Sequence, residues 1–455
     1  MTRNIDPVLK EIASIFNANH KEIYLVGGAV RDMIRGKKIH DWDLTTNALP
    51  SEVTEIMKRA GGKIIPTGIK HGTLTVIYKK SNAEITTFRT ESDYSDGRRP
   101  DNVYYTANIN DDLCRRDFTM NAIAMRLPDC ELIDPFEGEK DIRAKIIRCV
   151  GNPSDRFNED GLRPLRAVRF ASQLGFEIEK KTLEAASGAL CVCEKVSMER
   201  VRDEIDKILE SPVPSVGFRL MEKTGLLKLF LNELVCCRGI EQKGFHQFDV
   251  LDHSLLACDY AAAKEYSHEL RLASLFHDIG KPSCRALDKT GVYTFYRHEE
   301  VSASMCGKIL NRLRYPNAVI DKTCHLIKEH MFLYTDDWSD AAVRRFIARI
   351  GEGNLEDIYR LRRADAYGFC GKETDPIALL SLIDRVKSVT AGERVFSLKD
   401  LAVSGRELME AGIGSGKIMG IILKELLETV LDDPGQNTKE KLLEIAIRIY
   451  KERVK

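Results

Sequence analysis

Short apolar runs and helical patterns of apolar and polar positions alternate along the first 150 residues. Ile23-Tyr24-Leu25-Val26 is apolar throughout and ends at Gly27-Gly28, after which AVRDMIRG continues at helical spacing. This order predicts a strand, a glycine turn and a helix. A second strand is predicted to open at Asp41-Trp42-Asp43, and residues 68–78 and 84–88 are expected to form paired strands.

Helical periodicity dominates the rest of the chain. The segment SMERVRDEIDKIL (197–209) is strongly amphipathic, and we expect its Glu199, Arg200 and Glu204 to support the scaffold. Several segments between residues 370 and 455 repeat the same spacing. We therefore predict an α+β fold with a small mixed-sheet head (1–150), an all-helical neck (151–240), a helical body (241–368) and a helical tail (369–455).

Composition narrows the class of protein. The 455 residues exceed one typical domain, and 43% hydrophobic with 30% charged residues is ordinary for a water-soluble chain. No stretch is apolar enough to span a membrane, and the start of the chain lacks the apolar region of a secretion signal. The twelve Cys are scattered and form no CxxC pair. We expect a cytoplasmic protein without a zinc ribbon.

The formal net charge is zero, because basic and acidic side chains are equal in number. Proteins that bind nucleic acid usually have a basic balance. Any contact with RNA must therefore depend on a local basic surface.

Asp41 and Asp43 are the first candidates for chemistry. Residues i and i+2 of a strand project to one face, roughly 6–7 Å apart. Two carboxylates placed so can hold a pair of divalent ions about 3.5–4 Å apart, the arrangement used for nucleotidyl displacement, and Mg²⁺ prefers such oxygen ligands. Glu84 could be a third acidic ligand, and an ordinary solvated carboxylate is the alternative. Gly27 and Gly28 allow backbone N–H groups to approach a triphosphate, with Arg31 one helical turn away.

The stretch from Gly27 to Asp43 resembles the GGxVRDxxxG…DxD motif of class II tRNA nucleotidyltransferases, the family of CCA-adding enzymes and bacterial poly(A) polymerases. The resemblance implies a two-metal Mg²⁺ site at Asp41 and Asp43 in a nucleotidyltransferase head. It also implies a neck and a tail that bind RNA. The segment 89–102, which contains Arg98 and Arg99, reads as a surface loop; in the family a mobile loop here orients the incoming base.

A second motif, RRDFTMNA from Arg115 to Ala122, resembles the family's RRDFTxNA. The resemblance implies that Arg116 contacts phosphate while Asp117 and Asn121 bind ribose hydroxyls. The alternative is a structural Arg–Asp pair beside a capped helix.

A basic stripe follows, because Arg163, Arg166 and Arg169 are spaced three apart on a predicted helix. The stripe is either a solvated face or part of the nucleotide site. The preceding residues resemble the family's EDxxR template, in which Asp160 and Arg163 would read the base edge. Pro164 departs from that template, since Pro is tolerated only in the first turn of a helix.

The body contains a His…His-Asp…His…His…Asp succession, which resembles the HD superfamily of metal-dependent phosphohydrolases. Imidazole and carboxylate groups ligate several divalent metals. The expected ligands of this second divalent metal are His253, His277, Asp278, His298, His330 and Asp365. The alternative is an inherited helical bundle that serves only as a body.

The leading hypothesis is template-independent addition of CCA to the 3′ end of tRNA from CTP and ATP. Alternatives in the same family are A-adding, CC-adding and poly(A)-adding enzymes. An HD phosphohydrolase with a non-catalytic nucleotide-binding head is an alternative of another class. The sequence carries no signal of an oligomeric state.

Overall fold

The computed structural model describes residues 5–39, 42–69, 72–92, 102–242, 247–374, 376–392 and 396–454. Asp41, Arg98 and Arg99 therefore lie outside the described residues. The chain divides into two compact units, residues 1–235 and 236–455. The four-domain division stays a prediction.

The first unit begins with a seven-stranded mixed sheet in the order β3-β4-β5-β2-β1-β8-β9. β2 pairs with β5 in parallel, whereas the other neighbours in this sheet pair antiparallel. The strands are β1 (Ile23–Val26), β2 (Trp42–Thr46), β3 (Lys63–Gly68), β4 (Thr73–Tyr78), β5 (Ser81–Thr87), β8 (Ala124–Arg126) and β9 (Leu132–Ile133).

Burial follows the sequence pattern of these strands. β1 is buried along its whole length because it lies in the middle of the sheet. In β5, Ala83 and Ile85 are buried while Glu84 between them is exposed, as expected of a strand with one solvated face. Tyr24 of β1 packs with Phe88 and Val150 in a buried cluster. This core anchors β1, the strand that leads into Gly27 and α2.

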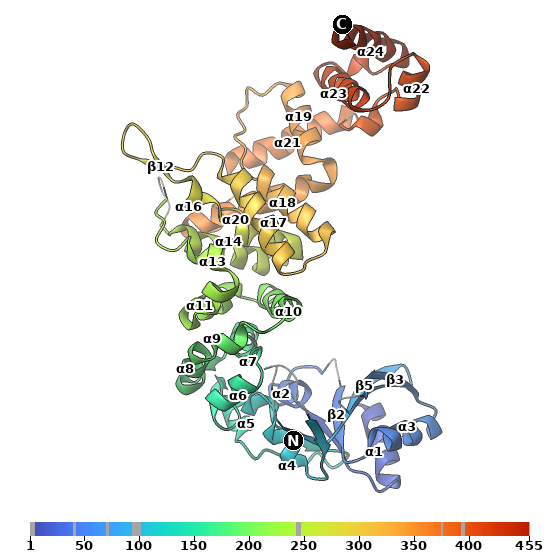
Figure 1. Ribbon diagram of the computed structural model, residues 1–455, viewed down its shortest axis with the longest axis vertical. Helices are drawn as coiled ribbons and strands as arrows, with labels where there is room; N and C mark the ends of the chain where they lie inside the picture. Colours follow the sequence, from blue (N-terminus) through green and yellow to red (C-terminus); the bar gives the residue numbers. More distant parts are fainter. Residues whose placement is uncertain are drawn as a thin grey trace. The chain divides into compact units, whose positions relative to one another are not determined.

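Short helices complete the head (Figure 1). They are α1 (Pro7–Ala18), α2 (Gly28–Ile34), α3 (Pro50–Arg59), α4 (Ile109–Cys114), the 3-10 helix η2 (Thr119–Asn121) and α5 (Gly138–Ala144). The predicted order of strand, glycine turn and helix at residues 23–35 is present. The predicted loop over 89–102 was wrong at its ends, because β6 (Arg89–Ser92) pairs with β7 (Asn102–Tyr105). Residues 93–101 lie outside the described part.

The rest of the first unit is helical, apart from the short parallel pair β10 (Ile146–Ile147) and β11 (Glu177–Ile178). The helices are α6 (Pro153–Glu159), α7 (Arg163–Leu174), α8 (Lys180–Gly188), α9 (Leu190–Cys193), α10 (Met198–Leu209), α11 (Pro214–Thr224), α12 (Leu226–Phe230) and α13 (Asn232–Val235). Pro164 lies in the first turn of α7, where its missing N–H costs nothing. Asp160 lies in the break between α6 and α7.

The second unit is a helical bundle, in which a short hairpin pairs β12 (Ala286–Leu287) with β13 (Tyr293–Thr294). Its helices are α14 (Val250–Ala263), α15 (His268–Phe276), α16 (Lys281–Cys284), α17 (His298–Arg312), α18 (Asn317–Glu329), α19 (Asp340–Ile350), η3 (Glu352–Asn354), α20 (Leu355–Cys370), α21 (Ile377–Gly392), η4 (Leu398–Asp400), α22 (Gly405–Glu410), α23 (Lys417–Asp432), η5 (Pro434–Gln436) and α24 (Lys439–Val454). α14 packs along α20, and α17 along α18.

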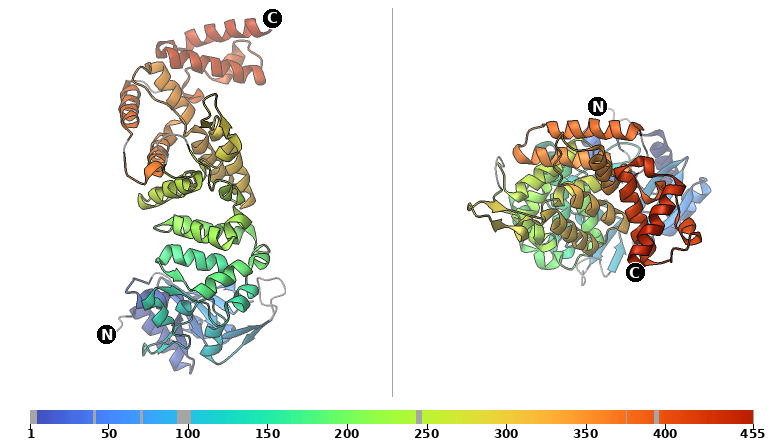
Figure 2. Two further views of the ribbon diagram at one scale, coloured as in Figure 1. Left: turned by 90° about the vertical axis from the view of Figure 1, so that its left-hand side faces the viewer. Right: turned by 90° about the horizontal axis from the view of Figure 1, so that it is seen from above.

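The last helices have an apolar core of their own. Figure 2 shows α23 and α24 side by side in red. Leu426 of α23 and Leu442 of α24 are fully buried in this core. Of the helices that the structure describes, none combines the length and the apolar character needed to cross a membrane.

Candidate functional site

A cavity of about 700 Å³, here called the head cavity, collects the residues singled out in the head and neck. The expected site residues that line it are Gly27, Gly28, Arg31, Asp43, Arg116, Asp117, Asn121, Asp160, Arg163, Arg166 and Arg169. They come from segments more than 100 residues apart in the sequence, and contacts from α7 to Asp117 and Arg31 help to bring these segments together.

Gly27 forms the turn between β1 and α2. Its φ of 67° is a left-handed backbone conformation that favours glycine. A Cβ at this position would lie 3.1 Å from Nη1 of Arg116 and 3.9 Å from Oδ2 of Asp43. The bare backbone of Gly27 therefore faces the space between a guanidinium and a carboxylate.

Asp43 is an exposed residue at the start of β2, and its side chain lines the head cavity. Glu84 lies level with it on the neighbouring strand β5, where Asp43 and Glu84 are register partners. Register partners project to the same face of a sheet. Two carboxylates thus meet on one face of the sheet, and their oxygens are the ligands that Mg²⁺ prefers.

Hydrogen bonds connect the predicted phosphate- and ribose-binding residues. Arg31 donates from Nη1 to Oδ1 of Asn121 at 3.0 Å. Asn121 in turn donates from Nδ2 to Oδ1 of Asp117 at 3.1 Å. Arg166 of α7 donates from Nε to the other oxygen of Asp117 at 2.8 Å. This network holds the side chains in one geometry before any ligand binds.

The surroundings of Asp117 strongly favour the ionised form of its carboxyl group over the protonated form. Burial alone would raise its pKa, but the positive charge of Arg166 and hydrogen bonds from Asn121 and Arg166 lower the pKa to about 2. Asp117 is therefore ionised at neutral pH and presents a hydrogen-bond acceptor to the head cavity.

The predicted base-reading residues are also held in place. Arg200 of α10 donates from Nη1 to Oδ1 of Asp160 at 3.3 Å and from Nη2 to Oδ2 at 2.9 Å. Arg163 donates to Oε2 of Glu159 at 2.6 Å and to the carbonyl oxygen of Arg115 at 3.0 Å. These contacts fix the side chains of both predicted base-reading residues at the junction of α6 and α7.

Sequence reasoning assigned Arg200 to the scaffold, but its side chain lines the head cavity. The only sequence signal was its place on an amphipathic helix, which does not reveal a partner 40 residues away. Glu204, on the same helix, does support the scaffold: its Oε2 lies 2.8 Å from Nε of Arg169.

Basic side chains outnumber acidic ones in the head cavity. The cations are Arg31, Lys38, Arg115, Arg116, Arg163, Arg166, Arg169 and Arg200, and the acids are Asp32, Asp43, Asp117 and Asp160. A chain of zero net charge thus contains a local positive region suited to a triphosphate.

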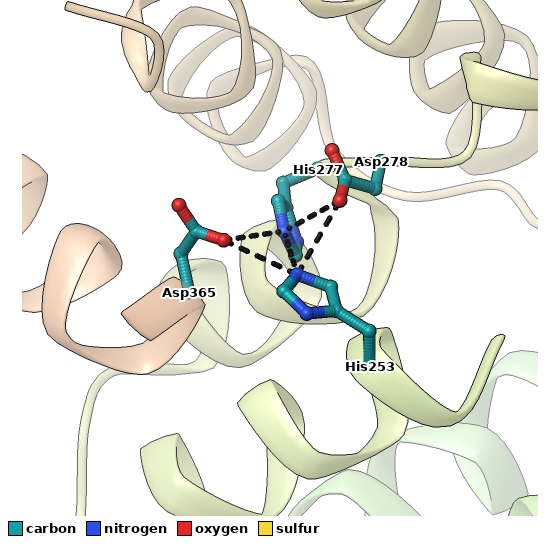
Figure 3. Close-up of side chains that lie close together, drawn as sticks. All are labelled: His253, His277, Asp278 and Asp365. Atoms are coloured by element: carbon teal, nitrogen blue, oxygen red, sulfur yellow. Dashed lines mark hydrogen bonds and ion pairs between the residues drawn. The ribbon is translucent and has the colours of Figure 1, made fainter. Parts of the chain in front are cut away.

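The second unit contains a separate group of buried side chains, here called the His–Asp cluster. Its members are the six expected metal ligands: His253, His277, Asp278, His298, His330 and Asp365. His253, His277, Asp278 and Asp365 lie close enough to share one ion, and so do Asp278, His298 and His330. Figure 3 shows the first group, in which Nε2 of His253 lies 3.0 Å from Nε2 of His277 and 3.1 Å from Oδ1 of Asp365.

The outer nitrogens of three imidazoles fix the direction of the inner ones. Nδ1 of His277 lies 2.9 Å from the carbonyl oxygen of Ser274, Nδ1 of His298 2.9 Å from that of Phe295, and Nδ1 of His330 2.6 Å from that of Ile327. A carbonyl oxygen only accepts, so each Nδ1 carries a hydrogen. In the neutral rings the Nε2 lone pairs point into the cluster, as in metal sites.

The carboxylates attract positive charge into this cluster. The pKa of Asp278 is well below its usual range, because His277 and Lys281 outweigh the effect of burial. Burial lowers the pKa of His277, but Asp278 and Asp365 outweigh it and raise the pKa to about 10. A bound proton or a metal ion would supply this positive charge. Oδ1 of Asp278 and Nε2 of His298 are buried 3.1 Å apart, with no hydrogen bond between them. A cation is the partner that suits both, so the residues fit a divalent metal.

Comparison with known proteins matches three family models along the chain. The poly A polymerase head domain matches residues 23–148, and the probable RNA and SrmB-binding site of polymerase A matches residues 175–237. A tRNA nucleotidyltransferase domain 2 model matches residues 294–446.

Relatives are similar over most of the chain. A CCA-adding enzyme of Lactobacillus delbrueckii subsp. bulgaricus is 35% identical over 423 residues, which are 93% of each chain. A CCA-adding enzyme of Lactobacillus johnsonii is 49% identical over 220 residues, so this match spans 48% of the chain and about half (53%) of that relative.

Solved structures of CCA-adding enzymes are also similar to this chain over nearly its whole length. The crystal structure of Bacillus stearothermophilus CCA-adding enzyme in complex with CTP superimposes with a TM-score of 0.72 and 27% identity, over 99% of both chains. The predicted α+β class, with a mixed-sheet head and a helical remainder, is confirmed. Together with the geometry of the head cavity, these matches place the chain in the tRNA nucleotidyltransferase family that includes the CCA-adding enzymes.

Proposed function

We propose that this protein adds CCA to the 3′ end of tRNA, using CTP and ATP and no nucleic-acid template. One observation carries the proposal: a single positively charged cavity brings together Asp43 of the sheet, a glycine turn and the firmly held side chains of Asp160 and Arg163. Relatives similar over nearly the whole chain are CCA-adding enzymes. The A-adding, CC-adding and poly(A)-adding activities are the alternatives.

Asp43, with Asp41 two residues before it, would hold Mg²⁺, and Glu84, the register partner of Asp43 on β5, would be a third ligand. Bound there, magnesium would lower the pKa of the RNA 3′-hydroxyl and neutralise the triphosphate, as two-metal sites do. The exposed carboxylate of Asp43 at the cavity and its level partner Glu84 support this assignment.

The remaining residues bind and orient the substrates. Gly27, Gly28, Arg31 and Arg116 would hold the triphosphate. Asp117 and Asn121, kept in position by Arg31 and Arg166, would accept and donate hydrogen bonds to ribose hydroxyls. Arg166 and Arg169 would add positive charge to the wall of the head cavity.

Asp160 and Arg163 would select the base. A carboxylate accepts a hydrogen bond from the exocyclic amine of C or A, and a guanidinium donates to a ring acceptor. U and G present the wrong groups to this pair. These two protein side chains would thus select the incoming nucleotide, a task that a template strand performs in template-dependent polymerases.

The His–Asp cluster supports a second candidate function, metal-dependent hydrolysis of phosphate esters. Its six buried ligands would hold a divalent ion, which supplies the attacking water when bound. RNA ends with phosphomonoesters or 2′,3′-cyclic phosphates fit this chemistry. A purely structural bundle is the alternative.

The twelve cysteines are all free thiols, which supports a reducing compartment such as the cytoplasm.

The test offers tRNA that ends at the discriminator base, at C or at CC to the full-length protein, with each NTP separately. We expect C, C and A to be added in that order and UTP and GTP to be rejected. Asp43→Ala should abolish incorporation, with Asp129→Ala, a charge removed at another head residue, as the matched control. Growth with ATP alone on every end would instead indicate a poly(A) polymerase, and incorporation that survives in Asp43→Ala would refute the metal assignment.

A further inference from the structure

Phe170 of α7 is an aromatic residue in the wall of the head cavity. Its side chain is only 6% exposed, and it lies one helical turn after Arg166. Residues four apart on a helix are neighbours on its surface, so the ring of Phe170 lies on the same side of α7 as Arg166. Apolar packing normally explains a buried Phe on a helix, but the neighbours of this ring are charged.

Three guanidinium groups lie over the ring of Phe170. The central carbon of the guanidinium is 4.0 Å from the ring centroid in Arg169, 5.3 Å in Arg31 and 5.5 Å in Arg166. The face of an aromatic ring carries partial negative charge and attracts cations within about 6 Å of its centroid. Phe170 therefore gathers three of the cations that line the head cavity, one from α2 and two from α7.

The three cations also repel one another. Burial lowers the pKa of Arg169 to about 10; Glu204 opposes this shift, and the charges of Arg166 and Arg31 add to it. The face of Phe170 offsets part of this repulsion. Because the ring has no net charge, it does so without reducing the positive charge that the three guanidiniums offer to a ligand.

Each of these guanidiniums is also ion-paired with a carboxylate. The pairs are Arg31 with Asp32 at 2.9 Å, Arg166 with Asp117 at 2.6 Å and Arg169 with Glu204 at 2.8 Å. A guanidinium has five N–H donors, and a carboxylate that binds it in a bidentate manner occupies two of them. The carboxylate and the ring thus hold each guanidinium from two directions and leave donors for a ligand.

The ring of Phe170 is itself held in place. It packs edge to face with Phe118, with ring centroids 5.8 Å apart and an angle of 87° between the planes. Phe118 is fully buried and follows Asp117, the carboxylate that pairs with Arg166. The position of the three cations is thereby connected to the apolar core of the head.

We propose that Phe170 is a positioning residue for the triphosphate of the incoming nucleotide. Its ring keeps the guanidiniums of Arg31, Arg166 and Arg169 together at the wall of the head cavity, and Phe170 acts on the triphosphate through them. It should therefore set the affinity for phosphate and leave the choice of base unchanged. The proposal rests on the proposed function, because it assigns a further residue to the same nucleotide site.

The experiment measures binding of CTP and of inorganic tripolyphosphate to the full-length protein in magnesium buffer by isothermal titration calorimetry. Phe170→Leu removes the aromatic face and should weaken the binding of both ligands by about tenfold, or about 1.4 kcal/mol. Cytidine has the base and the ribose but no phosphate, so it should bind both proteins equally. In the tRNA assay, KM for CTP and ATP should rise by a similar factor with kcat and the CTP:UTP preference unchanged.

Two further replacements separate the charge on the ring from its shape. Phe170→Tyr keeps the aromatic face and should bind CTP as the unaltered protein does. Site-specific replacement of Phe170 by 3,4,5-trifluorophenylalanine keeps the shape of the ring but withdraws electrons from its face. This variant should lose affinity for tripolyphosphate as Phe170→Leu does.

Phe16→Leu is the matched control, because Phe16 is a fully buried residue of α1 in the same head. It should lower Tm, since it leaves a cavity in the core, but it should leave the affinities for CTP and tripolyphosphate unchanged. Thermal unfolding of every variant shows that each is folded at the temperature of the binding measurement.

Equal affinity of Phe170→Leu and the unaltered protein for tripolyphosphate would overturn the proposal. Unchanged affinity in the trifluorophenylalanine variant would also overturn it, because packing alone would then explain the residue. An equal loss of affinity for cytidine would do the same, by showing that Phe170 only supports the fold. Binding of tripolyphosphate requires no RNA, so these outcomes are distinct from failure of the CCA-adding function, in which the unaltered protein would not extend tRNA.

Discussion

Arg200 holds both carboxylate oxygens of Asp160, and this contact has a consequence for fidelity. If Asp160 reads the base, its orientation decides which bases are accepted. We expect Arg200→Leu to reduce the preference for CTP over UTP by about tenfold, the effect of losing one charged hydrogen-bonded partner. The measurement is the ratio of kcat/KM values for the two nucleotides.

Arg202, on the same helix, is the control for this variant, because it pairs with its neighbour Asp203 instead. Arg202→Leu should leave the ratio unchanged. A fall in activity of Arg200→Leu with the same CTP:UTP ratio would show that Arg200 only supports the fold.

The lowered pKa of Asp117 makes stability depend on pH. Burial opposes ionisation, but Arg166 and Asn121 bring the pKa to about 2 in the folded protein, below the ~3.9 of an unfolded chain. The resulting stabilisation, about 2 kcal/mol, is fully present above pH ~4 and is lost as the pH falls through ~2. Urea unfolding between pH 3 and 7 should show a smaller pH dependence for Asp117→Asn than for the unaltered protein; equal dependence would contradict the assigned pKa.

At the scale of elements, the break between α6 and α7 depends on Gly161. A Cβ there would lie 2.4 Å from the carbonyl oxygen of Val192, closer than any real contact. Gly161→Ala should therefore move the turn that holds Asp160 and Arg163, lowering stability by roughly 1–3 kcal/mol and lowering incorporation. Thermal unfolding and the tRNA assay measure the two effects.

Gly188→Ala provides the comparison, since no atom lies within 4 Å of a Cβ at that position at the end of α8. This variant should be as stable as the unaltered protein or slightly more so. An equal loss of stability in both variants would show that the close approach of Gly161 to Val192 is unimportant.

Local patterns predicted the elements around the site but not their arrangement. The strand, glycine turn and helix at residues 23–35 follow from an apolar run and a helical repeat, and both are present. The parallel pairing of β2 with β5 brings together strands about 40 residues apart. Such pairings depend on long-range packing, which periodicity does not report.

The same limit applies to the site. Motif resemblance predicted roles for Asp117 and Asn121, and the spacing of the basic stripe made Arg166 a candidate; the head cavity brings the three together. The packing of α7 and α10 determines the hydrogen bonds among these residues. It also determines the hydrogen bonds from Arg200 to Asp160. A residue's spacing along one helix contains no information about its partner on another.

At the scale of the whole molecule, the head cavity and the His–Asp cluster lie in different compact units. We expect them to act independently. Asp43→Asn should abolish incorporation and leave the metal content of the cluster unchanged, whereas His277→Ala should lower the metal content and leave incorporation intact. Mass spectrometry for metals and the tRNA assay measure both, and loss of both properties in either variant would refute independence.

Asp43 and Glu84 lie side by side on adjacent strands, and like charges so placed repel. This repulsion acts at the edge of the site that would bind magnesium. Glu84→Gln should remove it and raise Tm by roughly 1–2 °C in a metal-free buffer, yet weaken magnesium binding. Magnesium binding and folding stability would then place opposite requirements on the same pair of carboxylates. A head domain stabilised in this way would bind magnesium more weakly and be a poorer enzyme.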